Sequence, residues 1–310
     1  MAGPGVEVLC CPEGLRAEAM HVLYRRVPRA ARPELVADAL AESRRGELDL
    51  DRLWVARRRG VLVAAMLTQR LAGRIAAVWA PEVSTRWGRD ALAERLLRAA
   101  LGAHRAEGVA VAQALVDARS PRRAGPDLAR GGLARVTDLI YLARDTDPLP
   151  VHAGTPRLDW RPYADAALPA FVAALDSTYV DSLDMPELEG IRGLEDVLAS
   201  HRAGGRFDPS RWQLGTVEGE PDALALALLT AAPDRDAWEV SYLGLSPSAR
   251  GRGLGRAALA HALDLARPHA PRLELAVDAR NLPADRLYRA SGFRPFDRRG
   301  VYLAVLGPRG

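Results

Sequence analysis

Hydrophobic and polar positions in the second half of the chain change their period from segment to segment. Apolar residues that alternate with polar ones, or that form short runs bounded by turn residues, predict strands, and apolar residues three to four apart predict helices. The predicted strands are 157–163, a hairpin across 210–232 with its turn at 218–222, 237–246, 272–279 and 293–306. The predicted helices are 164–180, 193–202, 255–269 and 283–292. This mixture of elements predicts an α/β fold, with a mixed sheet covered by helices.

The first half of the chain follows the same order with a fainter pattern. Its predicted helices are 14–27, 33–46, 88–108 and 123–133, and its predicted strands are a meander across 52–80, 109–118 and 136–145. Local matches place Gly88 over Gly255 and Gly132 over Gly292, which favours an internal duplication. A run of proline and turn residues between the halves predicts a linker at 148–156. We therefore expect two tandem domains, 1–147 and 157–310.

The composition is that of a globular protein and narrows the classes of function. Hydrophobic residues make up 48% of the chain and charged ones 26%, and no apolar run is long enough to span a bilayer. The formal net charge is +4, but the arginines are scattered among acids, lysine is absent and aromatic residues are only 5%. Because nucleic-acid binding needs a basic surface and stacking aromatics, we expect neither a nucleic acid nor a membrane as partner.

Cysteine and histidine give no sign of a disulfide framework or a metal site. Cys10 and Cys11 are adjacent, and the six histidines have no ligand-like spacing. The N-terminal residues lack the basic and apolar regions of a signal peptide. We therefore expect no metal and a cytoplasmic location.

A glycine-rich turn, "ARGRGLG" at 249–255, follows a predicted strand and begins a predicted helix. Such a turn offers unpaired backbone N–H groups and the positive end of the helix dipole, which together favour an anion such as a pyrophosphate. The chain has no lysine for a Walker A loop, and the spacing of Gly251, Gly253 and Gly255 differs from G-x-G-x-x-G. Arg250, Gly253 and Gly255 match the remaining candidate pattern, [QR]-x-x-G-x-[GA].

This turn and a second block resemble the GNAT acyltransferase superfamily. The second block is "VDARNLPADRLYRASGF", whose matching positions are Val277, Asn281, Ala284, Leu287, Tyr288, Gly292 and Phe293. The resemblance covers about 157–305 and extends to the first half only in architecture. It implies two tandem GNAT-like domains and acetyl-CoA as co-substrate. It also implies cofactor-binding residues on the strand, in the turn and after the next strand: Leu243, Gly244, Leu245, Arg250, Gly251, Arg252, Gly253, Leu254, Gly255, Arg256 and Asn281.

Two residues are candidates for the proton steps of acyl transfer. The resemblance implies Glu239 as the general base and Tyr288 as the acid that protonates the departing thiolate. Strand alternation places Glu239, Ser241 and Leu243 on one face and Trp238, Val240 and Tyr242 on the other. The alternatives are a solvated glutamate, a core tyrosine, and, for Asn281, a helix N-cap. In the first domain Val83, Arg86 and Leu128 replace the loop arginine, a glycine and the tyrosine, so we expect a degenerate, structural or acceptor-site role there.

The acceptor is the least specified part of the predicted function. The acidic segment 176–190 falls where the superfamily places a loop of the acceptor site, and Asp176, Asp181 and Asp184 would suit a cationic amine. A solvated loop is the alternative. We expect N-acetylation of a small-molecule primary amine by direct attack, with a protein or peptide N-terminus or lysine as the alternative acceptor. A non-catalytic CoA-binding sensor or scaffold is the alternative function. The sequence leaves the acyl length and the oligomeric state open.

Overall fold

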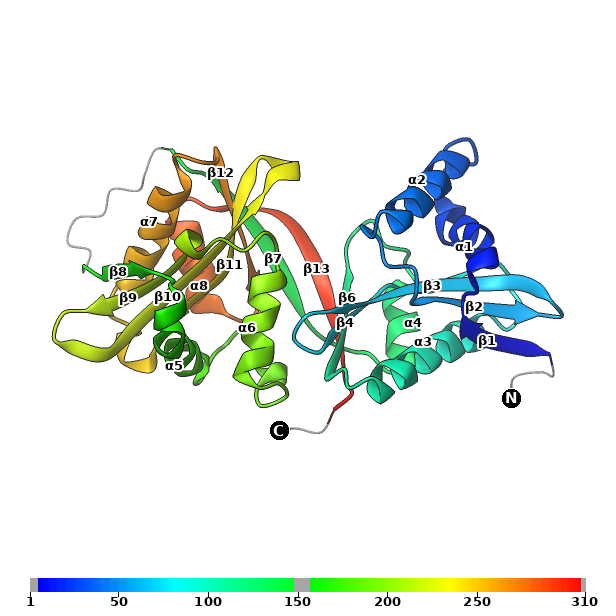
Figure 1. The fold of residues 1–310 in the computed structure, drawn as a ribbon, viewed down its shortest axis with the longest axis horizontal. Coiled ribbons are helices and arrows are strands. Elements are labelled where there is room, and N and C mark those ends of the chain that lie inside the picture. Colours follow the sequence, from blue (N-terminus) through cyan, green and yellow to red (C-terminus); the bar gives the residue numbers. More distant parts are fainter. Residues whose placement is uncertain (1–4, 148–156, 308–310) are drawn as a thin grey trace. The chain divides into compact units, whose positions relative to one another are not determined.

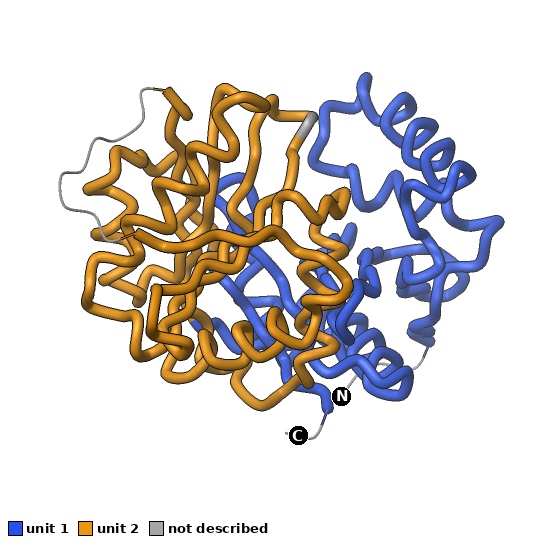
Figure 2. Tube along the Cα trace, turned by 60° about the vertical axis from the view of Figure 1, so that its left-hand side comes forward, with its two compact units in different colours: residues 1–136, 300–309 blue, residues 137–299, 310 orange. Residues whose placement is uncertain are grey.

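The computed structural model describes residues 5–147 and 157–307, and its elements follow the predicted order closely (Figure 1). The chain divides into two compact units (Figure 2). The first contains the residues up to Val136 and those from Gly300 onward, and the second contains Thr137–Arg299. No helix in the described ranges is long and apolar enough to cross a membrane.

The first unit is a mixed sheet with four helices. Its strands run in the order β1-β2-β3-β4-β6-β13, and β5 pairs with β3. The strands are β1 (Val6–Cys10), β2 (Leu53–Arg58), β3 (Val61–Leu71), β4 (Ile75–Val78), β5 (Glu82–Val83), β6 (Val111–Val116) and the end of β13 (Arg294–Val305). The helices are α1 (Arg16–Leu23), α2 (Arg32–Arg44), α3 (Arg89–Ala106) and α4 (Ala124–Gly131). The meander and the helices were predicted, whereas β1 was not.

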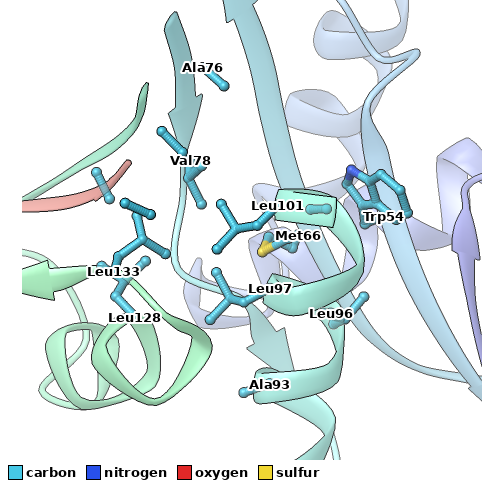
Figure 3. Close-up of a cluster of buried hydrophobic side chains, with 14 of the residues drawn as sticks. Trp54, Met66, Ala76, Val78, Ala93, Leu96, Leu97, Leu101, Leu128 and Leu133 are labelled. Atoms are coloured by element: carbon cyan, nitrogen blue, oxygen red, sulfur yellow. The ribbon is translucent and has the colours of Figure 1, made fainter. Parts of the chain in front are cut away.

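One core layer of the first unit lies between the sheet and helices α3 and α4, and a second lies between the sheet and helices α1 and α2. Buried residues of α3 recur every three to four positions from Leu92 to His104, which gives the helix one continuous apolar face. Figure 3 shows Leu97 and Leu101 of this face among Met66 and Val78 of the sheet. Through this face α3, which begins after Gly88, packs against the sheet.

The second unit is a mixed sheet in the order β7-β12-β11-β10-β9-β8. Its strands are β7 (Ala134–Asp145), β8 (Asp159–Pro162), β9 (Trp212–Val217), β10 (Glu220–Ala232), β11 (Ala237–Leu245) and β12 (Arg272–Asp278). Its helices are α5 (Leu168–Tyr179), α6 (Leu194–Ala203), α7 (Leu254–Ala266) and α8 (Leu282–Ala290). Among the neighbouring strands of this order, as far as the structure describes them, β11 and β12 alone pair in parallel. The predicted mixed α/β fold is confirmed.

Two apolar layers cover the faces of this sheet. On one face Ala227 and Leu229 of β10 pack with α7 and α8, and on the other Leu226 and Leu228 pack with α5 and α6. This strict alternation along β10 shows a strand that is buried on both sides. The sheet therefore carries α7 and α8, with the glycine turn, on one face and the acidic segment after α5 on the other.

Each unit completes its sheet with a strand from the other half of the sequence. Leu139–Asp145 of β7 pairs antiparallel with β12 in the second unit. Gly300–Val305 of β13, at the end of the chain, pairs antiparallel with β6 in the first unit. The compact units therefore differ from the predicted ranges 1–147 and 157–310, because periodicity specifies a strand but not its neighbour. The predicted linker, 148–156, lies outside the described residues.

Candidate active site

Strands β11 and β12 separate in the middle of the second unit's sheet. Their parallel pairing runs from Ala237 opposite Arg272 to Val240 opposite Leu275 and stops there. Beyond this point β11 continues to Leu245 on β10, and β12 continues to Asp278 on β7. The facing edges of the two strands are therefore unpaired after Val240, and unpaired edge groups are free to hydrogen-bond an extended ligand.

A β-bulge marks the separation and corrects the predicted faces of β11. The register with β10 shifts between Leu228, opposite Tyr242, and Leu229, opposite Val240, so Ser241 is the extra residue. Its hydroxyl donates to the Leu228 carbonyl at 2.9 Å. Val240 and Leu243 therefore belong to the α7 face, and Tyr242 belongs to the α5 face. Simple alternation wrongly placed Tyr242 with Val240, because a bulge reverses the side-chain pattern.

The glycine turn exposes backbone donors at the start of α7. Gly251 has φ +73° and Gly253, the N-cap of α7, has φ +81°, conformations that side chains other than glycine adopt rarely. None of the N–H groups of Gly251–Gly255 donates to an acceptor within the described ranges. Free N–H groups at the positive end of a helix dipole suit an anion, so the pyrophosphate site that the sequence predicts here stays a candidate.

The arginines of the turn differ in what they bind. The Arg250 guanidinium donates to the carbonyls of Thr178 (3.1 Å) and Val180 (2.7 Å), at the end of α5. Arg252 forms a bidentate pair with Glu220 at 2.6 and 2.7 Å. The exposed Arg256 forms no ion pair or hydrogen bond through its side chain within the described ranges. In this structure Arg250 positions the chain after α5. Arg256 is the arginine of the turn whose charge has no partner within the described ranges.

Two other glycines of the predicted cofactor site have packing roles. A Cβ on Gly255 would lie 3.2 Å from Leu287 of α8, so glycine allows the two helices to approach. A Cβ on Gly244 would lie 2.6 Å from the Tyr242 ring. The sequence suggested that Gly244 admits a ligand, whereas in the structure it admits the Tyr242 side chain.

Glu239 lies on β11 just before the strands separate. Its carboxylate pairs with Arg235 at 3.2 Å, and Glu239 is opposite Glu274 of β12. Burial raises the pKa of Glu239, and the negative charge of Glu274 acts in the same direction, although Arg235 and Arg299 oppose it. A carboxylate with a raised pKa is a better proton acceptor than an ordinary one, which suits a general base.

Tyr288 is buried on α8 within the apolar layer of the α7 face. Its hydroxyl forms no hydrogen bond with the protein within the described ranges, although buried tyrosine hydroxyls usually find one. Burial, together with the negative charge of Asp184, raises the pKa of Tyr288, so the phenol stays protonated at neutral pH. An unsatisfied, protonated hydroxyl is available as a proton donor.

All three predicted acceptor-site acids are exposed, and only the Asp184 carboxylate is bound by other residues of this region. Asp181 contributes its backbone carbonyl, which accepts from Arg250 at 3.3 Å. Asp184 accepts from the Asp278 N–H at 3.3 Å and from the Asn281 side chain. Asn281 is also the N-cap of α8, where its side-chain oxygen accepts from the Ala284 N–H, so the N-cap interpretation is confirmed.

The protein atoms around its carboxylate raise the pKa of Asp184, although the residue is exposed. Burial raises the pKa of Tyr179 to about 12 and also raises that of Tyr242, and the negative charge of Asp184 acts in the same direction. These two rings stack with centroids 5.4 Å apart. Sequence reasoning missed this aromatic group because its members come from α5 and β11, far apart in the chain.

The turn before α3 in the first unit is the counterpart of the glycine turn. Gly88, with φ +63°, is the N-cap of α3 as Gly253 is of α7, so it corresponds to Gly253 rather than to Gly255. In this register Asp90 takes the place of Gly255. Its carboxylate lies in the first turn of α3, where α7 has no acidic residue. A negative charge at this position opposes a second anion.

The same register changes one expected substitution. Thr85 takes the place of Arg250, whereas Val83, the residue predicted there, is buried in β5. Arg86 takes the place of Gly251, whereas the sequence alignment placed it over Gly253, and Leu128 is fully buried in α4. The first unit therefore lacks the side-chain pattern of the second at each of these positions.

Comparison with known proteins finds a family match in the second half of the chain. Residues 178–293 match the model of the acetyltransferase (GNAT) family. A mycothiol acetyltransferase of Beutenbergia cavernae is 35% identical over 179 residues, which cover 53% of this chain and 57% of the relative. One of Kineococcus radiotolerans is 34% identical over 172 residues, which cover 53% of each. The chain thus spans about half the length of these curated relatives.

A solved structure shares the fold over nearly the whole chain. The GCN5-related N-acetyltransferase of Sphaerobacter thermophilus superposes with a TM-score of 0.60 and 19% identity, over 99% of this chain and 98% of that one. At this identity the likeness concerns the fold alone, and it extends across both units. The matched segment, 178–293, lies inside the second unit, and over this segment the chain is similar to the acetyltransferase (GNAT) family.

Proposed function

We propose that the second unit transfers an acetyl group from acetyl-CoA to a primary amine by direct attack within a ternary complex. The observation that carries this proposal is the row of unpaired N–H groups at Gly251–Gly255, in the turn that follows β11 and opens α7. The same strand has an unpaired edge after Val240. A donor turn suits a pyrophosphate, and an unpaired strand edge suits an amide-bearing arm such as pantetheine.

In this mechanism each candidate residue has a distinct task. The turn 250–256 binds the pyrophosphate, with Arg256 adding charge, and the backbone of Leu243–Leu245 binds the pantetheine amides. Glu239 accepts a proton from the acceptor amine as the new N–C bond forms. Tyr288 donates its proton to the sulfur as the C–S bond breaks, and solvent returns a proton to the phenolate. Asn281 orients the start of α8, which carries Tyr288.

The acceptor that we propose is a cationic small-molecule amine held by Asp184. The charge of this carboxylate and the neighbouring rings of Tyr179 and Tyr242 suit an ammonium group. The matched relatives are mycothiol acetyltransferases, which supports an amine on a sugar-like acceptor. A protein N-terminus or lysine is the alternative acceptor. We propose that the first unit has no catalytic role and supports the second or contributes to the acceptor site.

The first test is a thermal-shift titration with acetyl-CoA, CoA and ATP. Binding to the folded state alone stabilises it by about 2.7 kcal/mol when the ligand is at 100 times its Kd. We therefore expect both CoA species to raise the Tm by several degrees and ATP to leave it unchanged. An equal shift with ATP would show only a general phosphate site, and no shift with either CoA species would refute the cofactor assignment.

Thiol release from acetyl-CoA in the presence of amines then tests catalysis. A panel of an amino sugar, an aminoacylated amino sugar and a lysine peptide covers the proposed and alternative acceptors. Release that depends on one of the sugar amines supports the proposal. CoA binding without release on any amine would favour a sensor or scaffold protein.

The pH profile tests Glu239 separately. Because Glu239 accepts protons only when it is ionised, kcat should fall as the pH is lowered through its raised pKa. Glu239→Gln should lower kcat about 100-fold and remove this acid limb. Glu274→Gln should move the limb to lower pH, because the charge of Glu274 contributes to the raised pKa. An unchanged limb in Glu239→Gln would assign the base to another group.

A further inference from the structure

The carboxylate of Asp278 is the centre of a hydrogen-bond network at the end of β12. Asp278 is fully buried, with 0% of its surface exposed. It accepts from the Thr137 hydroxyl at 2.6 Å, from the Arg280 backbone N–H at 2.9 Å and from the Arg280 guanidinium at 2.7 Å. The oxygen that binds the guanidinium, Oδ2, also accepts from the Met185 backbone N–H at 3.2 Å. Burying a carboxylate costs desolvation free energy, which the hydrogen bonds from these donors offset. The donors therefore indicate which segments the carboxylate holds in place.

Those partners include the acidic segment that follows α5. The backbone N–H of Asp278 donates to Asp184, so the segment and the strand end are joined in both directions. The Arg280 guanidinium bridges Asp278 to Glu187, which it binds at 2.6 and 2.9 Å. Met185 has φ +49°, a conformation that costs a methionine free energy and persists only where surrounding contacts impose it.

The network holds a charge that stays ionised at neutral pH. Burial by itself would raise the pKa of Asp278, but the hydrogen bonds from Arg280, Thr137 and Met185 outweigh it and lower the pKa. The hydrogen bonds that hold the segment are therefore maintained at the neutral pH at which an acetyl-transfer reaction would operate.

We propose that Asp278 is a positioning residue for acceptor recognition. Its carboxylate and backbone N–H fix the segment from Asp184 to Glu187 against the end of β12, and they thereby hold the Asp184 carboxylate at the N-terminus of α8. This inference rests on the proposed function, because it assigns Asp184 to the acceptor. Asp278 touches neither the amine nor the thioester, and it acts through the placement of Asp184.

Hydrogen–deuterium exchange of Asp278→Asn tests the positioning without any acceptor. The amide side chain keeps one acceptor atom and presents an NH2 group to donors, so part of the network is lost. We expect exchange in the peptide spanning 181–192 to become about tenfold faster, with acetyl-CoA still raising the Tm. Asp127→Asn is the matched control, because Asp127 is also buried and bound by an arginine, Arg89, but in the first unit. Its 181–192 peptide should exchange as in the unmodified protein.

Steady-state kinetics with the best amine of the panel complete the test. Asp278→Asn should raise the KM for this amine about tenfold and leave kcat and the KM for acetyl-CoA within about threefold. Asp184→Asn should raise the same KM, and the double variant should be no worse than Asp184→Asn alone, because both changes act through one carboxylate.

Unchanged exchange at 181–192 in Asp278→Asn would overturn the positioning role, and so would additive effects in the double variant. A protein that acetylates no amine of the panel but shows the faster exchange would refute the proposed acceptors while leaving the positioning of the segment established.

Discussion

Tyr288→Phe should lower kcat about 100-fold and leave the Kd for acetyl-CoA unchanged, because the variant lacks only the hydroxyl that protonates the thiolate. The same change should alter the free energy of unfolding by less than about 0.5 kcal/mol. The Tyr288 hydroxyl forms no hydrogen bond within the described ranges, so its removal breaks no hydrogen bond of the folded state. Thiol-release kinetics and a denaturant titration measure the two quantities. A large loss of activity without a loss of stability identifies a chemical role.

Tyr163→Phe is the matched control for this experiment. Tyr163 is also buried in the second unit, but its hydroxyl accepts from Arg202 and bonds to Asp165 at 3.3 Å. This variant should lose about 1 kcal/mol of stability and keep its kcat. If Tyr288→Phe turned over as fast as the unmodified protein, Tyr288 would have no part in the mechanism and its burial would be a matter of packing only.

Gly253→Val should weaken acetyl-CoA binding about 100-fold. Gly253 has φ +81°, and a β-branched residue is strongly disfavoured there, so the turn must change its backbone to accept valine. The N–H groups from Gly251 to Gly255 would then no longer converge on one anion. Isothermal titration with acetyl-CoA measures the loss, which corresponds to about 2.7 kcal/mol of binding free energy.

Gly88→Val separates this effect from backbone strain. Gly88 is the N-cap of α3 with φ +63°, so valine there strains the first unit in the same way. Both variants should lose about 1–2 kcal/mol of stability. Only Gly253→Val should lose acetyl-CoA binding. Equal loss of binding in both variants would point to a general destabilisation, and normal binding in Gly253→Val would reject the turn as the pyrophosphate site.

Much of the fold could be predicted from periodicity. The helices were predicted at their observed places in the chain. The apolar period of 3.6 residues in a long helix such as α3 distinguishes it clearly from a strand. The short strand Val6–Cys10 was missed, since five residues carry little periodic signal. The hairpin was found, but its turn is Glu218–Gly219 rather than 218–222, because β10 already begins at Glu220.

The glycine turn could be located from sequence because glycines mark positions where the backbone departs from helix and strand. Gly251 and Gly253 have positive φ in the structure. The side chains of the site were predicted less well. Arg250 was expected near the cofactor, but it binds carbonyls at the end of α5, and Asp278 was not considered. A side chain's partner depends on which distant segment packs beside it, and local sequence carries no record of that.

The sequence by itself determined the kinds and order of the elements, the glycine turn at the start of α7 and the resemblance to the GNAT superfamily. These features depend on residues close together in the chain. Only the tertiary structure decided that β7 completes the second sheet and the end of β13 the first, that the bulge at Ser241 turns Tyr242 to the α5 face, and that Asp184 meets Asp278 and Asn281. Each of these depends on register or on contacts between residues far apart in the chain. The local pattern permits several such arrangements equally, and the packing free energy of the whole unit selects one of them.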